Sequence, residues 1–329
     1  MEKHLLDVKH LRTNFHTQAG LVQAVRDVSF FVDENECVGI VGESGCGKSV
    51  TMLSVMHLLD ENAESTAESI LFNEQEISAY TDSQMRKLNG AQMSMIFQDP
   101  MTSLNPVFTI GQQFAEPLKR HLGLKGKAAR EKAREMLELV GIPMPEERLS
   151  QYPHELSGGL RQRVMIAIAM CCNPKLLIAD EPTTALDVTV QAQILELMKK
   201  MKETCHSSVI LISHDLGVIS TLASRVIVMY GGKIVEESTV DELFYEPMHP
   251  YTKGLLASIP AKAGEKLIPI YGTPPDLLDP PKGCPFAARC GSCMKICQQA
   301  MPGIHAASES HYCRCWLYHP SIVNKKEVR

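Results

Sequence analysis

The architecture of this chain follows from one short stretch, Gly42-Glu43-Ser44-Gly45-Cys46-Gly47-Lys48-Ser49. It follows an apolar run, 37–41, that predicts a buried strand, and it leads into 48–59, where apolar residues recur at helical spacing. A glycine-rich loop between a strand and a helix can turn its backbone N–H groups toward a phosphate. Lys48 would neutralise phosphate charge, and Ser49 would offer its hydroxyl to Mg²⁺. The stretch therefore predicts a phosphate-binding loop.

A second apolar run ends in two carboxylates. Leu176 to Ala179 is followed directly by Asp180 and Glu181. In a chain with a phosphate loop, this pattern predicts that Asp180 holds Mg²⁺, directly or through water, and that Glu181 polarises the attacking water as general base. Without the loop, the same residues would indicate only a strand that ends in a solvated turn.

Strand and helix patterns alternate along most of the chain. Strands are expected where apolar and polar residues alternate or where a short apolar run ends abruptly, and helices where apolar residues recur every third or fourth position. The expected strands are 5–15, 21–32, 37–41, 176–179, 209–212, 225–230 and 233–237, and the expected helices are 48–59, 127–140 and 188–202. This alternation indicates a sheet with parallel strands covered by helices, and Gly231-Gly232 predicts a β-hairpin.

Length and composition limit the domain organisation. The 329 residues, 44 % of them hydrophobic, allow one large α/β domain and a smaller appendage. We expect an ATPase-type core over 1–250 with a helical insertion at about 90–168, a proline-rich linker over 251–283, and a Cys-rich module over 284–329.

Charge and hydropathy exclude some classes of protein. The net charge is −5, and Lys and Arg are spread along the chain, so we expect no nucleic-acid partner. No stretch reaches the roughly 18 apolar residues that a membrane-spanning helix needs, and the amino end lacks an apolar signal segment. We therefore expect a cytosolic chain.

A third motif lies at Leu156 to Arg163, which reads Leu-Ser-Gly-Gly-Leu-Arg-Gln-Arg. It predicts a second anion-binding helix start, although Ser157 would serve equally well as an ordinary N-cap. With this motif the chain resembles the ATP-binding-cassette (ABC) ATPases over about residues 5–250. The resemblance implies a mixed-sheet core, an antiparallel β subdomain and a helical signature subdomain. It also implies head-to-tail pairing of two such domains, with each ATP clamped between one phosphate loop and the partner's signature serine.

The resemblance also implies roles for single residues. Gln98 corresponds to the glutamine that touches Mg²⁺ and the attacking water, and His214 to the switch histidine near the γ-phosphate. Asp187, in Ala185-Leu186-Asp187, corresponds to the D-loop, and Phe15 is the candidate for stacking on adenine. The predicted catalytic residues are Glu181, His214 and Gln98, and the predicted Mg²⁺ ligands are Ser49, Gln98 and Asp180. The predicted ATP-contacting residues are Phe15, Gly42, Glu43, Ser44, Gly45, Cys46, Gly47, Lys48, Ser49, Gln98, Ser157, Gly158, Gly159, Gln162, Asp180 and Asp187.

Cysteines are concentrated near the carboxyl end. The chain has 11 cysteines, and six of them lie between Cys284 and Cys315. In a cytosolic chain this density predicts metal binding rather than disulfides. Thiolates suit Zn²⁺ or an iron–sulfur cluster, while unligated, reduced cysteines are the alternative. Cys293 and Cys313 leave the choice of ligands open.

The tail resembles the end of the oligopeptide and dipeptide importer ATPases. The matching residues are Gly283-Cys284-Pro285, Arg289-Cys290, Cys297 and Cys315 to Tyr318, together with Gln98 to Pro106 and His249 to Thr252. Some members with this tail bind a [4Fe–4S] cluster. The resemblance therefore implies Cys284, Cys290, Cys297 and Cys315 as cluster ligands, with Zn²⁺ as the alternative.

The expected function is ATP hydrolysis that drives the import of di- or oligopeptides, at the cytoplasmic face of the membrane. The resemblance implies two permease subunits, a paralogous ABC ATPase and an extracytoplasmic solute-binding protein as partners. One alternative is the same motor role for nickel or another small solute. Others are a non-transport cassette acting on nucleic acid or the ribosome, and an iron–sulfur sensor. The non-transport reading is disfavoured because such proteins usually carry two cassettes or a long coiled coil.

Overall fold

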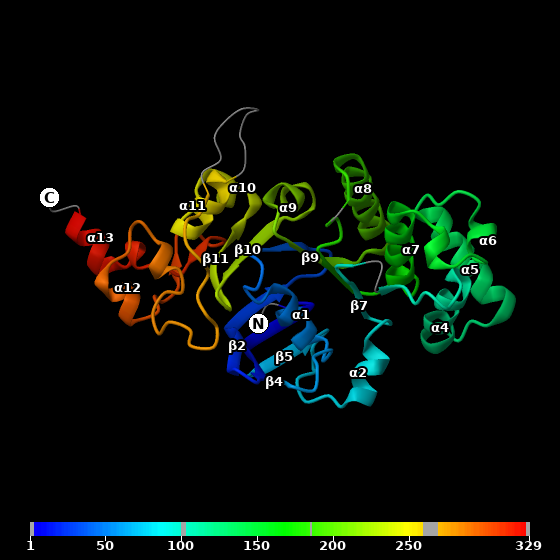
Figure 1. Cartoon of the computed structure of the whole chain (residues 1–329), viewed down its shortest axis with the longest axis horizontal. Helices are drawn as coiled ribbons and strands as arrows, with labels where there is room; N and C mark the ends of the chain where they lie inside the picture. The colour runs from blue at the N-terminus through cyan, green and yellow to red at the C-terminus, as the bar shows by residue number, and fades with distance from the viewer. Residues whose placement is uncertain (1–2, 100–102, 185, 259–268, 327–329) are drawn as a thin grey trace. The chain divides into compact units, whose positions relative to one another are not determined.

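The computed structural model describes residues 3–99, 103–184, 186–258 and 269–326 (Figure 1). The chain forms two compact units, each named here for the motif it contains. The signature unit comprises Met1–Leu5, Val32–Cys37 and Ala79–Ser213, and the phosphate-loop unit comprises Leu6–Phe31, Val38–Ser78 and His214–Arg329. Among the described residues, no helix is both long enough and apolar enough to cross a membrane.

The phosphate-loop unit contains an antiparallel sheet with strand order β2-β1-β5-β6, and β4 also pairs with β1. Its strands are β1 (Leu6–Thr17), β2 (Gly20–Val32), β4 (Ala63–Thr66), β5 (Ser69–Phe72) and β6 (Gln75–Glu76). Val8 and Leu11 of β1 are buried because alternate residues of a strand point to the same face of the sheet. The predicted strand pair at 5–15 and 21–32 is confirmed.

The same unit holds a set of mixed strands. β3 (Cys37–Val41) runs parallel to β10 (Arg225–Tyr230), which pairs antiparallel with β11 (Lys233–Thr239). Gly231 and Gly232 have φ angles of 54° and 76°, as the tight turn between these strands requires, so the predicted hairpin is confirmed. The helices of this unit are α1 (Lys48–Val55), α9 (Leu216–Leu222), α10 (Val240–Tyr245), α11 (Pro250–Ala257), α12 (Lys295–Gln299) and α13 (Pro320–Lys326).

The Cys-rich segment continues this sheet. β13 (Tyr312–Cys313) pairs with β11, and β12 (His305–Ala306) pairs with β13. Cys313 is buried against Met248, and Cys313 lies opposite Glu236 in the ladder. The expected separate Cys-rich module is therefore not supported, because backbone pairing and side-chain packing join the segment to the rest of its unit.

The signature unit combines parallel strands with a group of helices. β7 (Met93–Ile96) is parallel to β8 (Leu176–Asp180), which is parallel to β9 (Ser208–Ser213). The helices are α2 (Asp82–Leu88), α4 (Ile110–Leu122), α5 (Gly126–Leu139), α6 (Pro145–Arg148), α7 (Gly158–Met170) and α8 (Val188–Cys205). Figure 1 shows α4, α5, α6 and α7 gathered together, in green. The residues that α5 buries are Ala129, Ala133, Met136 and Leu137, which share one face of a helix.

Candidate functional site

The predicted phosphate loop connects β3 to α1, as its sequence requires. Gly42 and Gly47 have φ angles of 154° and 102°. A Cβ atom at Gly42 would lie 2.2 Å from the carbonyl oxygen of Met229, and one at Gly47 would lie 2.5 Å from that of Ala24. Backbone atoms cannot yield as a flexible side chain could, so both positions require glycine.

Lys48 begins α1 at the end of this loop. Its side chain is buried, and Nζ donates to the carbonyl oxygens of Gly42, at 2.8 Å, and Glu43, at 3.2 Å. Gly47, the N-cap residue of α1, has no side chain with which to cap the first N–H groups of the helix. The loop thus places a cationic amine beside backbone N–H groups, an arrangement suited to an anion.

Residues outside the loop hold Glu43 in place. The N–H group of Glu43 donates to Tyr251 Oη at 2.8 Å, and its carboxylate is paired with Arg289. Burial raises the pKa of the neighbouring Cys46 thiol, which therefore stays protonated at neutral pH. Sequence reasoning did not find Arg289 as a partner of the loop. The only available signal was its place in the Arg289-Cys290 pair of the tail resemblance.

The predicted carboxylates lie in the signature unit, where β8 ends. Asp180 is buried at the end of the strand, and Glu181 follows with a φ angle of 46°. Such a conformation costs a non-glycine residue about 1–3 kcal/mol and is often found at functional sites. The Glu181 N–H group donates to the carbonyl oxygen of Ile212 at 3.0 Å, so the strained turn is fixed by the neighbouring strand.

The structure brings together two of the predicted catalytic residues. Gln98 Nε2 donates to Glu181 Oε2 at 3.1 Å, and Thr184 Oγ1 donates to the same oxygen at 2.8 Å. Two donors on one carboxylate oxygen fix the orientation of the Glu181 side chain. Sequence reasoning missed Thr184, although its position three residues after the acidic residue is a spacing typical of side-chain hydrogen bonds in turns.

The signature segment starts helix α7. Ser157 is its N-cap, and Ser157 Oγ accepts from the N–H group of Leu160 at 3.4 Å. Gly158 and Gly159 form the first turn, and Gln162 Nε2 donates to the carbonyl oxygen of Pro182 at 2.6 Å. Gln162 therefore ties α7 to the turn that follows the two carboxylates. Within one copy of the chain Ser157 acts as a cap, and the predicted contact with a partner's ATP stays a prediction.

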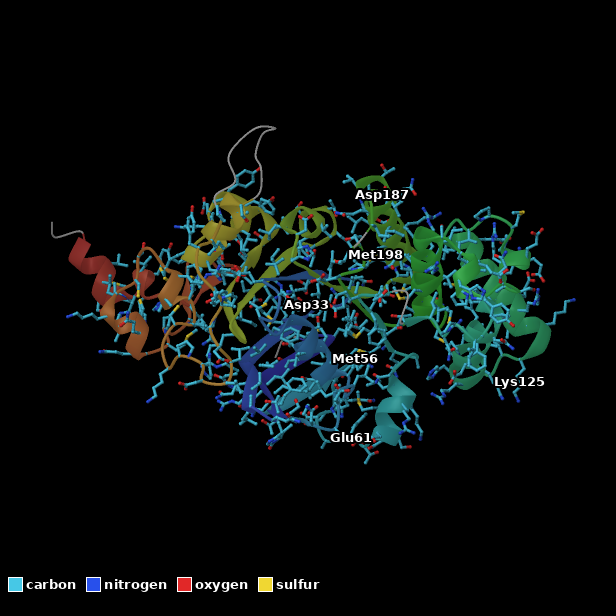
Figure 2. The ribbon with its side chains drawn as sticks, in the orientation of Figure 1. Asp33, Met56, Glu61, Lys125, Asp187 and Met198 are labelled. Atoms are coloured by element: carbon cyan, nitrogen blue, oxygen red, sulfur yellow. The ribbon has the colours of Figure 1, made fainter. Side chains whose placement is uncertain are left out.

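The remaining predicted residues are distributed over both units. Asp187, labelled in Figure 2, is exposed and caps α8 by accepting from the N–H group of Val190 at 2.9 Å. His214 is exposed after β9, and Phe15 is half-buried on β1 opposite Ala63 of β4. The phosphate-loop unit contains Phe15, Gly42 to Ser49 and His214. The signature unit contains Gln98, Ser157, Gly158, Gly159, Gln162, Asp180, Glu181 and Asp187. Ala185 of the D-loop match and residues 100–102 of the tail-subfamily match lie outside the described residues.

The four cysteines predicted as cluster ligands do not form such a site. Across the part of the chain that the structure describes, no group of three or more His, Cys, Asp or Glu side chains could hold a metal ion. Burial raises the pKa of Cys284 to about 12, with smaller contributions from the thiols of Cys290, Cys297 and Cys315, and burial also raises the pKa values of Cys290 and Cys297. Cys315 is hydrogen-bonded to Cys313, which lowers the pKa of Cys315. The predicted [4Fe–4S] or Zn²⁺ site is therefore not supported.

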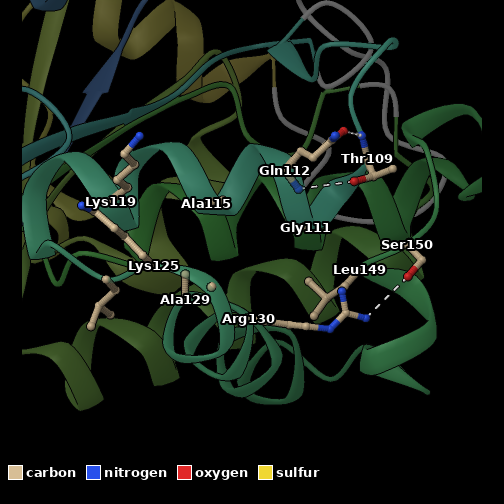
Figure 3. A pocket seen from close by; sticks show the side chains of 12 residues that line it. Thr109, Gly111, Gln112, Ala115, Lys119, Lys125, Ala129, Arg130, Leu149 and Ser150 are labelled. Atoms are coloured by element: carbon tan, nitrogen blue, oxygen red, sulfur yellow. Dashed lines mark hydrogen bonds between the residues drawn. The ribbon is translucent and has the colours of Figure 1, made fainter.

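A surface cavity in the signature unit lies apart from the predicted motifs. It has a volume of about 580 Å³ and lies between residues of α4, α5 and the chain around Leu149 (Figure 3). Lys119, Lys125 and Arg130 contribute to its lining, but Arg130 Nη2 also donates to Ser150 Oγ at 3.5 Å. The lining residues do not include the predicted ATP-contacting residues, so this cavity does not mark the nucleotide site.

Comparison with known proteins identifies the class of protein that this fold and these motifs define. Residues 25–184 match the family described as "ABC transporter", and residues 235–297 match "Oligopeptide/dipeptide transporter, C-terminal region". A solved dimeric structure of the ATP-binding cassette MJ0796, in a post-hydrolysis state bound to ADP and Pi, is similar with a TM-score of 0.64 at 27 % identity, over 71 % of this chain and 98 % of that one.

Curated relatives match nearly the whole chain. It is 55 % identical to the dipeptide transport ATP-binding protein DppD of Bacillus subtilis (strain 168), covering 96 % of this chain and 95 % of that protein. It is 52 % identical to the oligopeptide transport ATP-binding protein OppD of the same organism, and the match covers 96 % of this chain and 89 % of that protein. The chain therefore belongs to the ATP-binding proteins of ABC transporters, and it is an ABC ATPase.

Proposed function

We propose that this chain is the ATP-hydrolysing subunit of an ABC importer for dipeptides or oligopeptides. The observation that carries the proposal is the identity of 55 % and 52 % to dipeptide and oligopeptide transport ATP-binding proteins, which extends through the tail. The match of residues 235–297 to the C-terminal region of such transporters supports the same cargo class. These relatives favour peptides over nickel, and they favour transport over a role on nucleic acid or the ribosome.

In this proposal the two motif regions divide the chemistry of hydrolysis. Lys48 and the loop N–H groups bind the phosphates, while Ser49, Asp180 and Gln98 provide oxygen ligands for Mg²⁺. Mg²⁺ would neutralise charge that develops on the transferred phosphoryl group. Glu181 accepts a proton from the attacking water, and His214 contacts the γ-phosphate. The hydrogen bonds from Gln98 and Thr184 to Glu181 support its role, because they hold the carboxyl group in one orientation.

The remaining expectations complete the proposal. Phe15 stacks on adenine, and Ser157, Gly158, Gly159, Gln162 and Asp187 complete the site of a partner ATPase. The proposed partners are two permease subunits, a paralogous ABC ATPase and an extracytoplasmic solute-binding protein, at the cytoplasmic face of the membrane. The domain boundaries at 1–250, 251–283 and 284–329 stay predictions. No step of this function passes through the cysteines of the tail.

Uptake by whole cells tests the proposal. Cells of the source organism that carry only a Glu181→Gln copy are compared with wild-type cells for uptake of labelled dipeptides, oligopeptides and nickel. The matched control is Glu196→Gln, the same chemical change at an exposed position of α8. Loss of peptide uptake with Glu181→Gln alone would support the proposal. Loss of nickel uptake alone would change the cargo, and loss of neither would refute a role in transport.

A further inference from the structure

The phosphate loop contains an acidic side chain, Glu43. A carboxylate near bound phosphates opposes their binding, because like charges repel strongly wherever water is partly excluded. In this chain the charge is neutralised from a distant part of the sequence. Arg289 Nη1 donates to Glu43 Oε2 at 2.6 Å, and Arg289 Nη2 donates to Glu43 Oε1 at 3.0 Å. This is the bidentate geometry in which arginine binds a carboxylate most strongly.

The guanidinium group of Arg289 is itself fixed by further acceptors. Nη1 also donates to Tyr230 Oη at 3.0 Å, Nε to the carbonyl oxygen of Tyr271 at 3.0 Å, and Nη2 to that of Ile270 at 2.9 Å. The Arg289 side chain is only 6 % exposed, while that of Glu43 is 26 % exposed. A group held by this many partners is pre-organised, so it can hold the loop in one conformation.

An aromatic cluster connects the same segment to the backbone of the loop. Phe286 lies edge-on to Tyr230, with ring centroids 5.2 Å apart, and its ring lies 5.4 Å from that of Tyr251. Tyr251 accepts the N–H group of Glu43 at 2.8 Å. Glu43 is therefore held at both ends, at its N–H group by Tyr251 and at its carboxylate by Arg289.

Residues 269–290, here called the clamp segment, make further contacts around the loop. The N–H group of Gln23 donates to the carbonyl oxygen of Leu277 at 2.9 Å, and Arg26 Nη2 donates to that of Pro281 at 3.0 Å. A Cβ atom at Gly231 would lie 2.9 Å from Pro285 Cβ, which shows how closely the hairpin and the clamp segment approach. All these residues belong to the phosphate-loop unit.

We propose that Arg289 is a positioning residue for nucleotide binding, through which the clamp segment sets the conformation and the charge of the phosphate loop. Arg289 acts through Glu43 and does not touch the nucleotide. The inference rests on the proposed function, since its effect is on the affinity for ATP. Loss of Arg289 leaves a partly buried carboxylate unpaired beside the phosphates, and removal of one member of a buried ion pair costs more than removal of both.

The test measures equilibrium binding of a non-hydrolysable ATP analogue with Mg²⁺ to the purified full chain. Four variants are compared with wild type: Arg289→Gln, Arg289→Lys, Glu43→Gln and the double variant Arg289→Gln/Glu43→Gln. We expect Arg289→Gln to raise Kd by about tenfold or more, as expected for an unpaired charge near the ligand, and Arg289→Lys to raise it less. The double variant should recover most of the lost affinity, because the unpaired carboxylate has been removed.

Glu43→Gln alone provides a test that does not depend on the folding of an Arg289 variant. It should bind the analogue at least as tightly as wild type, because it removes negative charge from the loop. A purely structural role for the ion pair predicts the opposite, namely weaker binding in Glu43→Gln and no recovery in the double variant. Either of these results would overturn the inference, as would wild-type affinity in Arg289→Gln.

A second partly buried ion pair supplies the matched control. Arg225 is paired with Glu237 in the same unit, and Arg225 Nη2 donates to the carbonyl oxygen of Phe31 at 2.8 Å. Arg225→Gln should leave the Kd for the analogue unchanged even where it lowers the melting temperature. A loss of affinity equal to that of Arg289→Gln would overturn the specific role of Arg289. Wild-type chain that binds no analogue would instead contradict the proposed function itself.

Discussion

Gln98 Nε2 donates to Glu181 Oε2 at 3.1 Å, across 83 positions of sequence. The two residues lie after different strands, β7 and β8, which run parallel in the signature unit. Because parallel strands end at the same edge of a sheet, the residues that follow them can meet there. The contact links the proposed general base to a residue that is expected to touch Mg²⁺ and the attacking water.

Glu181→Gln should abolish hydrolysis without abolishing ATP binding. Glutamine keeps an oxygen that accepts from Gln98 and Thr184, but it cannot take a proton from water. We expect kcat to fall by about 10²–10⁴-fold, the usual contribution of a general base. Phosphate release by the assembled transporter measures the rate, and analogue binding measures affinity. Turnover at the wild-type rate would contradict the assignment.

Thr184→Val should slow hydrolysis while preserving the shape of the side chain. The change removes a 2.8 Å hydrogen bond to a carboxylate. A hydrogen bond to a charged group contributes about 1.5 kcal/mol, so we expect kcat to fall by about tenfold with little change in KM. Thr184→Ser restores the hydroxyl and should restore the rate. If Thr184→Val and Thr184→Ser have the same kcat, the hydroxyl does not orient Glu181.

Ser157→Asp separates capping from the proposed contact with a partner's ATP. Aspartate is as good an N-cap as serine, so the melting temperature of the chain should not change. Its negative charge would oppose a phosphate bound at the start of α7, so ATP hydrolysis by the transporter should fall strongly. Thr109→Asp is the control, because Thr109 caps α4 in the same way. Loss of stability with retained hydrolysis would show that Ser157 is only a cap.

His249 should make stability depend on pH. The residue is buried, and burial lowers its pKa to about 3, so it stays neutral in the folded chain but binds a proton below pH 6.5 in the unfolded chain. The unfolded state then binds more protons, and stability is lost as the pH falls from 6.5 toward 3. Between pH 7 and 5 this contributes a loss of about 2 kcal/mol.

His249→Asn supplies the comparison for this pH dependence. His249 Nδ1 accepts the N–H group of Tyr251 at the start of α11, and asparagine can make the same capping bond without titrating. Thermal unfolding at a series of pH values should therefore show a flatter dependence for His249→Asn between pH 6.5 and 5. Parallel curves for the two proteins would show that other groups cause the pH dependence.

The sequence alone was sufficient for features that depend on neighbouring residues. The strand at 37–41, the loop glycines and the helix at Lys48 are coded within one short stretch, because backbone sterics and local hydrogen bonds decide them. The hairpin at Gly231-Gly232 was predictable for the same reason, since that turn requires positive φ angles. No local pattern distinguishes Gln98. It was predicted as a site residue only because the order of motifs resembles that of a known family.

Tertiary structure decided the features that depend on residues far apart in the chain. Arg289 and Glu43 are separated by 246 positions, and Gln98 reaches Glu181 because the strands that precede them, β7 and β8, are adjacent. The predicted set of four cysteine ligands also depended on how distant parts of the chain fold together. Cysteine spacing in the sequence does not determine where the thiols point or how deeply they are buried. For Cys313, pairing of β13 with β11 decides the burial of the thiol, since a strand's partner fixes which of its side chains face the interior.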